Sequence, residues 1–218
     1  MSTGNITSVQ PGKLTALLKN VLVTGFGLLA VDSLAYDGSS GEVTATINSG
    51  HNYKKDSILL IEGANEDAYN GEQRITFVSV TQFRYAPSSA PSATVETGIV
   101  SAKVAPVGWE VVAESPSGEV MIFGPTDPNS GPIKLLVNNT INQGDNWSAY
   151  DERTLAGVSM VEDVVSIDSY TVVATGFWPA SHAFGLGCWQ VVADPRLMYL
   201  SVNYGANKRN SILPFGEL

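Results

Sequence analysis

Side chains able to act as nucleophiles, bases or metal ligands are few in this sequence. Its only histidines are His51 and His182, and its only cysteine is Cys188. Two histidines exclude a multi-histidine metal site, and one cysteine excludes both a cysteine-only zinc site and an intrachain disulfide. Ser181 and His182 are adjacent, but the strand-turn-helix context of a nucleophile elbow is missing around them. The sequence therefore predicts no catalytic, metal-binding or cofactor-binding residues, and we expect a protein that is not an enzyme.

Carboxylates and turn residues offer two further kinds of site. Paired carboxylates act as acid and base in glycosidases, and such a pair could form in space, but nothing in the sequence selects one. The candidates are Glu110, Asp145, Asp151, Glu152, Glu162 and Asp163. The segment from Asp127 to Gly131 lacks the calcium-loop pattern and is typical of a reverse turn, although it could hold a cation weakly. We expect these carboxylates to form solvated acidic faces.

Several aromatic residues lie in or beside apolar runs, which indicates packing in a core. They are Trp109, Phe123, Tyr150, Trp178, Trp189 and Tyr199. A carbohydrate-binding surface would need several exposed aromatic rings, and few aromatic residues fall in segments of loop type. These are Tyr69, Tyr85, Tyr204 and Phe215. Core packing is the expected role of the aromatic residues, and a sugar-binding surface is the alternative.

One segment has the periodicity of an amphipathic helix. Its apolar residues follow the i, i+3, i+4, i+7, i+8 spacing that places side chains on one helical face. They are Leu14, Leu17, Leu18, Val21 and Leu22. The helix is expected over residues 13–23, beginning near Pro11-Gly12 and ending before Gly25, since glycine suits the position just past a helix end. We expect its apolar face to pack on a β surface or on a neighbouring subunit.

The rest of the chain is typical of β structure. Residues 42–48 alternate apolar and polar side chains with the period of two that marks a strand with one buried face. Further strand-like runs recur about every ten residues, which favours sandwiches and barrels over βαβ units. These runs cover 57–61, 73–80, 94–104, 109–113, 120–123, 133–137, 161–167, 170–174, 188–192 and 197–203. The prediction is an all-β fold of small barrel or sandwich modules with one N-terminal amphipathic helix.

With 218 residues, the chain is long enough for two small domains. We expect the boundary near Ala105-Pro106, where the first set of strands ends and a new series begins. The first domain, residues 1–104, would contain the helix and a β module, and the second, residues 105–218, would be sandwich-like. The proline-rich stretch 86–93 is expected to be a loop that is either mobile or in contact with a neighbouring protein.

The charge and the N-terminal sequence argue against some partners. The formal net charge is -9 with twelve Lys and Arg residues, whereas nucleic-acid binding requires several cations to neutralise phosphates. The first ten residues lack the basic start and apolar run of a secretory signal. The apolar stretch 14–31 is interrupted too often to span a membrane. We therefore expect no nucleic-acid or membrane partner, and synthesis in a cytoplasm.

Residues 50–83 combine several short motifs. They contain a Gly50-His51 turn with an aromatic residue after it, a Gly63-Ala64 pair, an Asn70-Gly71 pair and a strand that ends at Phe83. The Asn70-Gly71 pair suits a tight turn between two paired strands, because glycine accepts the positive φ of such turns. The combination resembles a module of tailed-bacteriophage virion proteins. The sequence departs from that module at Lys55, where glycine is usual.

The resemblance extends over nearly the whole chain, through residues 17–27 and 105–110 and through weaker similarities. The weaker similarities are residues 126–128, 135–139, 157–160, 177–179 and 189–194. The family consists of structural proteins encoded among phage head and tail genes. The resemblance implies a structural component of a tailed-phage virion, synthesised in the cytoplasm of the bacterial host. It would assemble as a symmetric homo-oligomer and with other head, neck or tail proteins. The alternative is a receptor- or glycan-binding appendage, such as a capsid decoration or tail-tip adhesin.

Overall fold

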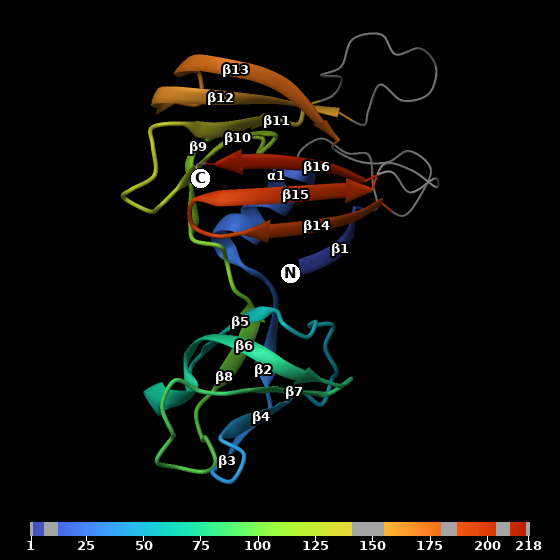
Figure 1. Cartoon of the computed structure of the whole chain (residues 1–218), viewed down its shortest axis with the longest axis vertical. Helices are drawn as coiled ribbons and strands as arrows, with labels where there is room; N and C mark the ends of the chain where they lie inside the picture. The colour runs from blue at the N-terminus through green and yellow to red at the C-terminus, as the bar shows by residue number, and fades with distance from the viewer. Residues whose placement is uncertain (1, 7–12, 141–154, 180–186, 204–209, 217–218) are drawn as a thin grey trace. The chain divides into compact units, whose positions relative to one another are not determined.

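The computed structural model describes residues 2–6, 13–140, 155–179, 187–203 and 210–216. Antiparallel sheets make up most of it, with a short helical segment near the N-terminus (Figure 1). The predicted all-β fold with one N-terminal helix is therefore confirmed. Within these residues, no helix is both long enough and apolar enough to cross a membrane.

The chain divides into two compact units, and their composition corrects the expected domain assignment. The first unit contains residues 25–105 with residues 1–2, and the second contains residues 3–24 and 106–218. The chain passes back to the second unit between Ala105 and Pro106. Placing the helix in the first domain was wrong, because the helix packs with the strands that follow Pro106.

The first unit is a curled antiparallel sheet. Its strand order is β2-β8-β5-β6-β7-β4-β3. The strands are β2 (Phe26–Val31), β3 (Ser33–Asp37), β4 (Glu42–Thr46), β5 (Ile58–Glu62), β6 (Gly71–Val78), β7 (Gln82–Tyr85) and β8 (Val100–Val104). Its two outermost strands, β2 and β3, are consecutive in the chain and are separated only by Asp32. Since Val95 also bridges to Ala35 on β3, the sheet closes on itself and forms a small barrel.

Alternating side chains of these strands fill the barrel. On β4, Val43 and Ala45 are fully buried, and on β7 Phe83 and Tyr85 are fully buried. Each hydroxyl of a buried tyrosine requires a hydrogen-bond partner. The Tyr53 hydroxyl lies 2.7 Å from the carbonyl oxygen of Gly27 and 2.6 Å from that of Ala102. It therefore ties β2 to β8 at the place where their pairing register shifts.

The prediction of a tight turn at Asn70-Gly71 was wrong. Strands β5 and β6 do pair antiparallel, but Ile61 lies opposite Gly71, and a longer connection joins them. This connection contains the 3-10 turn η2 (Asp67–Tyr69). The Asn70 side chain accepts the N–H of Ala64 at 3.0 Å and donates to its carbonyl oxygen at 3.0 Å, so it closes the loop. Gly71 does take a positive φ of 98°.

The second unit contains two antiparallel sheets. The five-stranded sheet has the order β13-β12-β11-β10-β9, and the four-stranded sheet has the order β1-β14-β15-β16. The first sheet comprises β9 (Trp109–Glu114), β10 (Val120–Pro125), β11 (Lys134–Asn138), β12 (Leu155–Ser166) and β13 (Ser169–Pro179). The second comprises β1 (Ser2–Ile6), β14 (Gly187–Ala193), β15 (Leu197–Asn203) and β16 (Asn210–Gly216). Buried Trp109 connects them, with its ring 5.9 Å from Phe215 and its Nε1 donating to the Asp194 carbonyl oxygen at 2.9 Å.

The helical segment consists of α1 (Lys13–Lys19) and a π-helical turn, η1 (Asn20–Thr24). It ends at Gly25, whose φ of 73° favours glycine. Of the predicted apolar face, Leu17 is half-buried and the other members are buried. The N–H of Leu14 donates to Asn139 Oδ1 at 2.8 Å, and the Thr15 hydroxyl donates to the Gly118 carbonyl oxygen at 2.7 Å. The helix therefore packs on a β surface of its own unit. This is the first of the two predicted positions, the other being a neighbouring subunit.

Candidate functional site

His51 has a packing role in the barrel. Its ring stacks on Tyr53 at a centroid distance of 5.0 Å and meets Phe83 edge-on at 5.6 Å. Its Nδ1 accepts the backbone N–H of Tyr53 at 3.3 Å. Burial lowers the pKa of the imidazole from its ordinary value of 6.5, because a buried site disfavours the charged form. The ring is therefore neutral at pH 7. His182 lies outside the described residues.

The end of the proline-rich stretch 86–93 is anchored to the barrel. The Glu66 carboxylate accepts the backbone N–H groups of Ser92 and Ala93. These hydrogen bonds, with that of Ser92 the largest cause, lower the pKa of Glu66. The Tyr69 hydroxyl donates to the Ala93 carbonyl oxygen at 2.6 Å, and Pro91 is buried. The C-terminal end of this loop is therefore fixed by its own unit.

The candidate carboxylates that the structure describes lie on two strands, β9 and β12. Glu110 lies exposed on β9, whereas Glu162 and Asp163 lie near the end of β12. Asp145, Asp151 and Glu152 fall outside the described residues. No group of three or more His, Cys, Asp and Glu side chains suitable for a metal ion occurs in the described part of the chain.

The segment at Asp127 forms the predicted reverse turn. Asp127 Oδ1 accepts the backbone N–H of Asn129 at 2.8 Å and its side-chain amide at 3.0 Å. The N–H of Ser130 donates to the Asp127 carbonyl oxygen at 2.9 Å. The hydrogen bond from the backbone of Asn129 is the largest cause of the lowered pKa of Asp127. This carboxylate therefore stabilises the turn itself.

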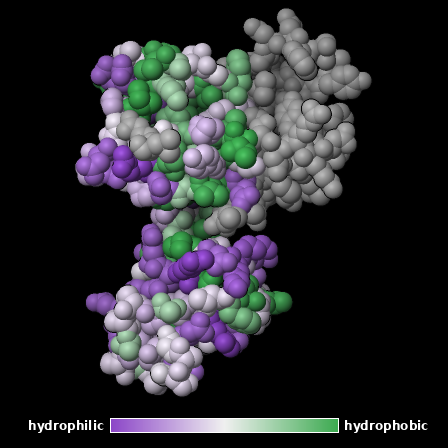
Figure 2. All heavy atoms as spheres, viewed as in Figure 1, coloured by the Kyte–Doolittle hydropathy of each residue, from purple (hydrophilic) through white to green (hydrophobic). Residues whose placement is uncertain are grey.

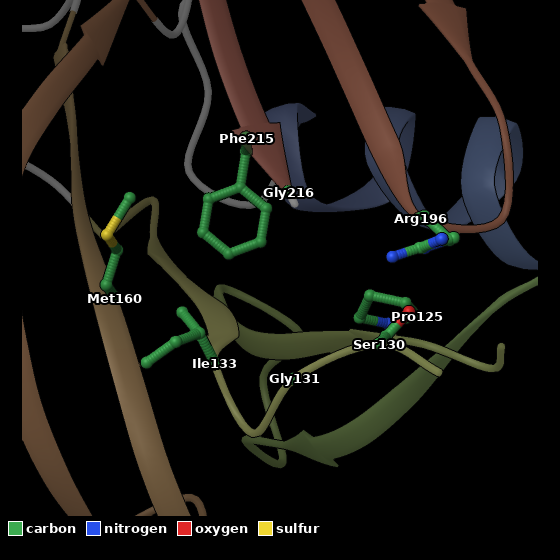
Figure 3. Close-up of a pocket in the computed structure, with 8 residues that line it drawn as sticks. All are labelled: Pro125, Ser130, Gly131, Ile133, Met160, Arg196, Phe215 and Gly216. Atoms are coloured by element: carbon green, nitrogen blue, oxygen red, sulfur yellow. The ribbon is translucent and has the colours of Figure 1, made fainter. Parts of the chain in front are cut away.

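A pocket of about 210 Å³ lies in the second unit. Its lining residues are Pro125, Ser130, Gly131, Ile133, Met160, Arg196, Phe215 and Gly216. Figure 3 shows the Arg196 side chain over Pro125 and Ser130, with Phe215 across the pocket. Arg196 Nε is 4.0 Å from Asp127 Oδ2, a long ion pair. Among the residues that the structure describes, the buried Ser130 Oγ has no hydrogen-bond partner.

The aromatic residues only partly follow the sequence expectation. Trp109, Phe123 and Trp178 are buried as predicted, but Tyr199 is 40% exposed. Of the aromatics considered for a sugar-binding surface, Tyr69 and Tyr85 are fully buried in the barrel and Phe215 is 4% exposed in the second unit. These three rings cannot form an exposed platform for a sugar. Tyr150, the side chain of Trp189 and Tyr204 lie outside the described part of the structure.

Strand β13 forms an open edge of the second unit. It is an eleven-residue strand at one end of the five-stranded sheet. Every side chain from Thr171 to Phe177 is exposed, including Val172 at 52%, Val173 at 50% and Phe177 at 57%. Successive side chains of a strand point to opposite faces, so both faces are open to solvent. We call residues 171–177 the β13 edge.

The adjacent strand β12 differs sharply from β13. Its side chains Ala156 and Val161 are fully buried, and Val158 is 8% exposed. Within the described residues, β13 pairs only with β12, so its outer backbone groups have no strand partner there. An open strand edge with apolar side chains is a template for pairing with another chain. The β13 edge is therefore a candidate assembly surface.

The four-stranded sheet presents a second apolar surface. Val192 lies opposite Tyr199, and Tyr199 lies opposite Pro214, so these three residues share one face of the sheet. Ile212 is on the same face and is 66% exposed. The other face, with Val191, Leu200 and Phe215, is buried. Figure 2 shows apolar residues in green between polar ones on the surface of the second unit.

The sequence analysis predicted a strand at 170–174 but missed that the strand is exposed on both faces. A signal was present, because the sequence from Ser169 to Pro179 contains no Asp, Glu, Lys or Arg residue. Edge strands usually carry charges that prevent pairing. The missing charges could have marked an edge intended for a partner, but the strand order that makes β13 an edge is a tertiary property.

Comparisons of the chain with protein-family models, with curated proteins and with solved structures found no match.

Proposed function

We propose that this protein is a non-enzymatic structural component of a tailed-bacteriophage virion. It assembles with copies of itself and with other head, neck or tail proteins. The resemblance of residues 17–110 to phage virion proteins supports a place in the virion. The exposed surface of the second unit supports assembly with other protein copies.

The β13 edge is the observation that carries an assembly role. Monomeric proteins protect edge strands with charges, proline, bulges or covering segments. Strand β13 has a bulge at Val173, where its register with β12 shifts, and it ends at Pro179. It carries no charge, however, and the side chains of residues 171–177 remain exposed, including two adjacent valines and a phenylalanine that are at least half-exposed. Burial of apolar area contributes roughly 25 cal/mol per Å². A partner strand on this edge would therefore add both backbone hydrogen bonds and apolar contact.

The polar groups of the described residues support a structural role rather than a reaction. The His51 ring is packed among aromatic rings, Glu66 holds backbone N–H groups, and Asp127 stabilises its own turn. Each of these interactions maintains the local conformation of the chain. Nucleophilic catalysis would instead need a nucleophile hydrogen-bonded to a base that is itself oriented by a third group.

Quantitative mass spectrometry of purified particles of the phage that encodes this chain tests the proposal. We expect the protein at a fixed number of copies per particle, related to the symmetry of the head, neck or tail. Absence from the particles would refute a virion role. Saccharide cleavage by the purified protein, abolished by substitution of a single carboxylate, would place it among enzymes instead.

A further inference from the structure

We propose that the β13 edge pairs antiparallel with the β13 edge of a second copy, across a twofold axis. The two five-stranded sheets would then form one continuous sheet. This inference rests on the proposed function, since it names the first partner in the assembly and the strand that contacts it.

The uncharged side chains of β13 allow a second copy of this strand as its partner. Each chain has a formal net charge of -9, so two copies repel each other over most orientations. Strand β13 contains no ionisable Asp, Glu, Lys or Arg side chain along its eleven residues. Like charges directly opposite each other destabilise a strand pair. Pairing of β13 with itself places no such charges opposite each other.

The other strand edges of the second unit are less suited to receive β13. Strand β9, at the far end of the same sheet, carries Glu110 and Glu114, and Glu114 forms an ion pair of 2.6 Å with Lys19 of α1. Strand β16 contains Pro214, which has no N–H to donate. Strand β1 has only five residues.

These differences disfavour a head-to-tail addition of β13 to another edge of the next copy. In a twofold interface, the same surface patch of each subunit contacts its copy on the other subunit. A strand that carries no charge and exposes Val172, Val173 and Phe177 meets that requirement with itself. The geometry therefore points to a dimer as the unit from which larger assemblies are made.

Light scattering coupled to size-exclusion chromatography tests the dimer with the full chain. We expect a mass twice the 23.1 kDa of one chain. Val173→Lys places a charge on the β13 edge and should reduce the mass to that of one chain. Val165→Lys is the matched control, because Val165 is 83% exposed on β12 and outside the edge, and this variant should remain dimeric. At a dilution where the wild-type protein is monomeric, both variants should have melting temperatures within a few degrees of the wild-type value.

A monomeric wild-type protein would overturn the inference, as would a dimer that Val173→Lys leaves intact. A trimer or another odd oligomer would also overturn it. If Val173→Lys fails to fold, cross-linking of single cysteines along β13 tests the pairing instead.

Single cysteines at each position from 171 to 177, in a Cys188→Ser background, distinguish the geometry. Disulfides require Cα atoms within about 7 Å. In an antiparallel pair about a twofold axis, only residues near the axis approach their own copies. We therefore expect oxidised dimers to peak at one position, or at two adjacent positions, and to decline on both sides. Equal cross-linking along the strand, or none, would contradict the twofold pairing.

The outcomes separate this inference from the proposed function. A protein present in particles but monomeric, or dimeric through another surface, would retain the virion role and refute β13 pairing. A β13-paired dimer absent from particles would retain the pairing and refute the virion role.

Discussion

The aromatic surroundings of His51 determine its protonation. The ring packs against Tyr53 and Phe83 in the barrel. The same burial that lowers the pKa of His51 raises the pKa of the Tyr53 hydroxyl to about 12. In both residues the low-dielectric surroundings disfavour the charged form. The folded barrel therefore binds fewer protons at His51 than the unfolded chain does near pH 6.

This difference predicts a loss of stability in mild acid. The unfolded pKa is about 6.5 and the folded pKa is lower, so stability is full above pH 6.5 and decreases as the pH falls toward the folded pKa. We expect wild-type protein to have a lower urea midpoint at pH 5.5 than at pH 7.5. His51→Asn keeps an acceptor near the Tyr53 N–H and should make this decrease smaller, whereas His182→Asn serves as the control. Equal decreases in wild type and His51→Asn would contradict the prediction.

The helical segment α1–η1 is stabilised by burial more than by its own length. Seven residues of α helix and five of π helix are too few to be stable alone in water. Leu14, Leu18 and Leu22 are fully buried. The N–H of Leu14 donates to the side chain of Asn139, the residue that follows β11. The helix is therefore part of the core of the second unit.

Leu18→Asp should destabilise the second unit by about 3–5 kcal/mol, since it removes a core leucine and buries a charge. Ala16→Asp provides the matched control on the exposed side of the same helix. It should cost less than about 1 kcal/mol, the range of helix propensity. Chemical unfolding of the full chain measures both. Similar effects of the two substitutions would show that the face of Leu18 is not buried.

At the scale of the whole chain, the barrel is an insertion between the helix and the strands on which the helix packs. Residues 25–105 form the barrel as one contiguous segment, and the second unit is assembled from residues on both sides of it. The buried residues of the barrel form a cluster drawn from that segment alone. A domain with its own core can fold independently.

We expect residues 25–105 to fold as an isolated fragment and residues 106–218 to fail without the helix. The first fragment keeps its closed sheet and core, whereas the second loses four buried apolar side chains of α1 and η1. Circular dichroism and dispersed amide signals in NMR spectra measure folding. Joining residues 13–24 to residue 106 through a short glycine-serine linker should restore the second unit. A cooperative unfolding transition of 106–218 alone would contradict this view.

Local patterns in the sequence were sufficient to predict the elements with regular periodicity. The spacing of Leu14, Leu18 and Leu22 predicted a helix that ends before Gly25, because helical periodicity and a glycine with positive φ are local properties. Alternation over residues 42–48 predicted β4 for the same reason. Strands β2 and β3 were missed, and a shift in the pairing register of β2 disguises its alternation.

Only the tertiary structure decided which surfaces these elements share. It placed the helix on strands that begin more than eighty residues later, because burial depends on neighbours in space rather than in sequence. It buried Tyr69 and Tyr85, which lie in segments that resemble loops, because the barrel closes over them. It also made β13 an edge. The composition of β13 is uncharged in the sequence, but its exposure on both faces follows from the strand order, which no local pattern encodes.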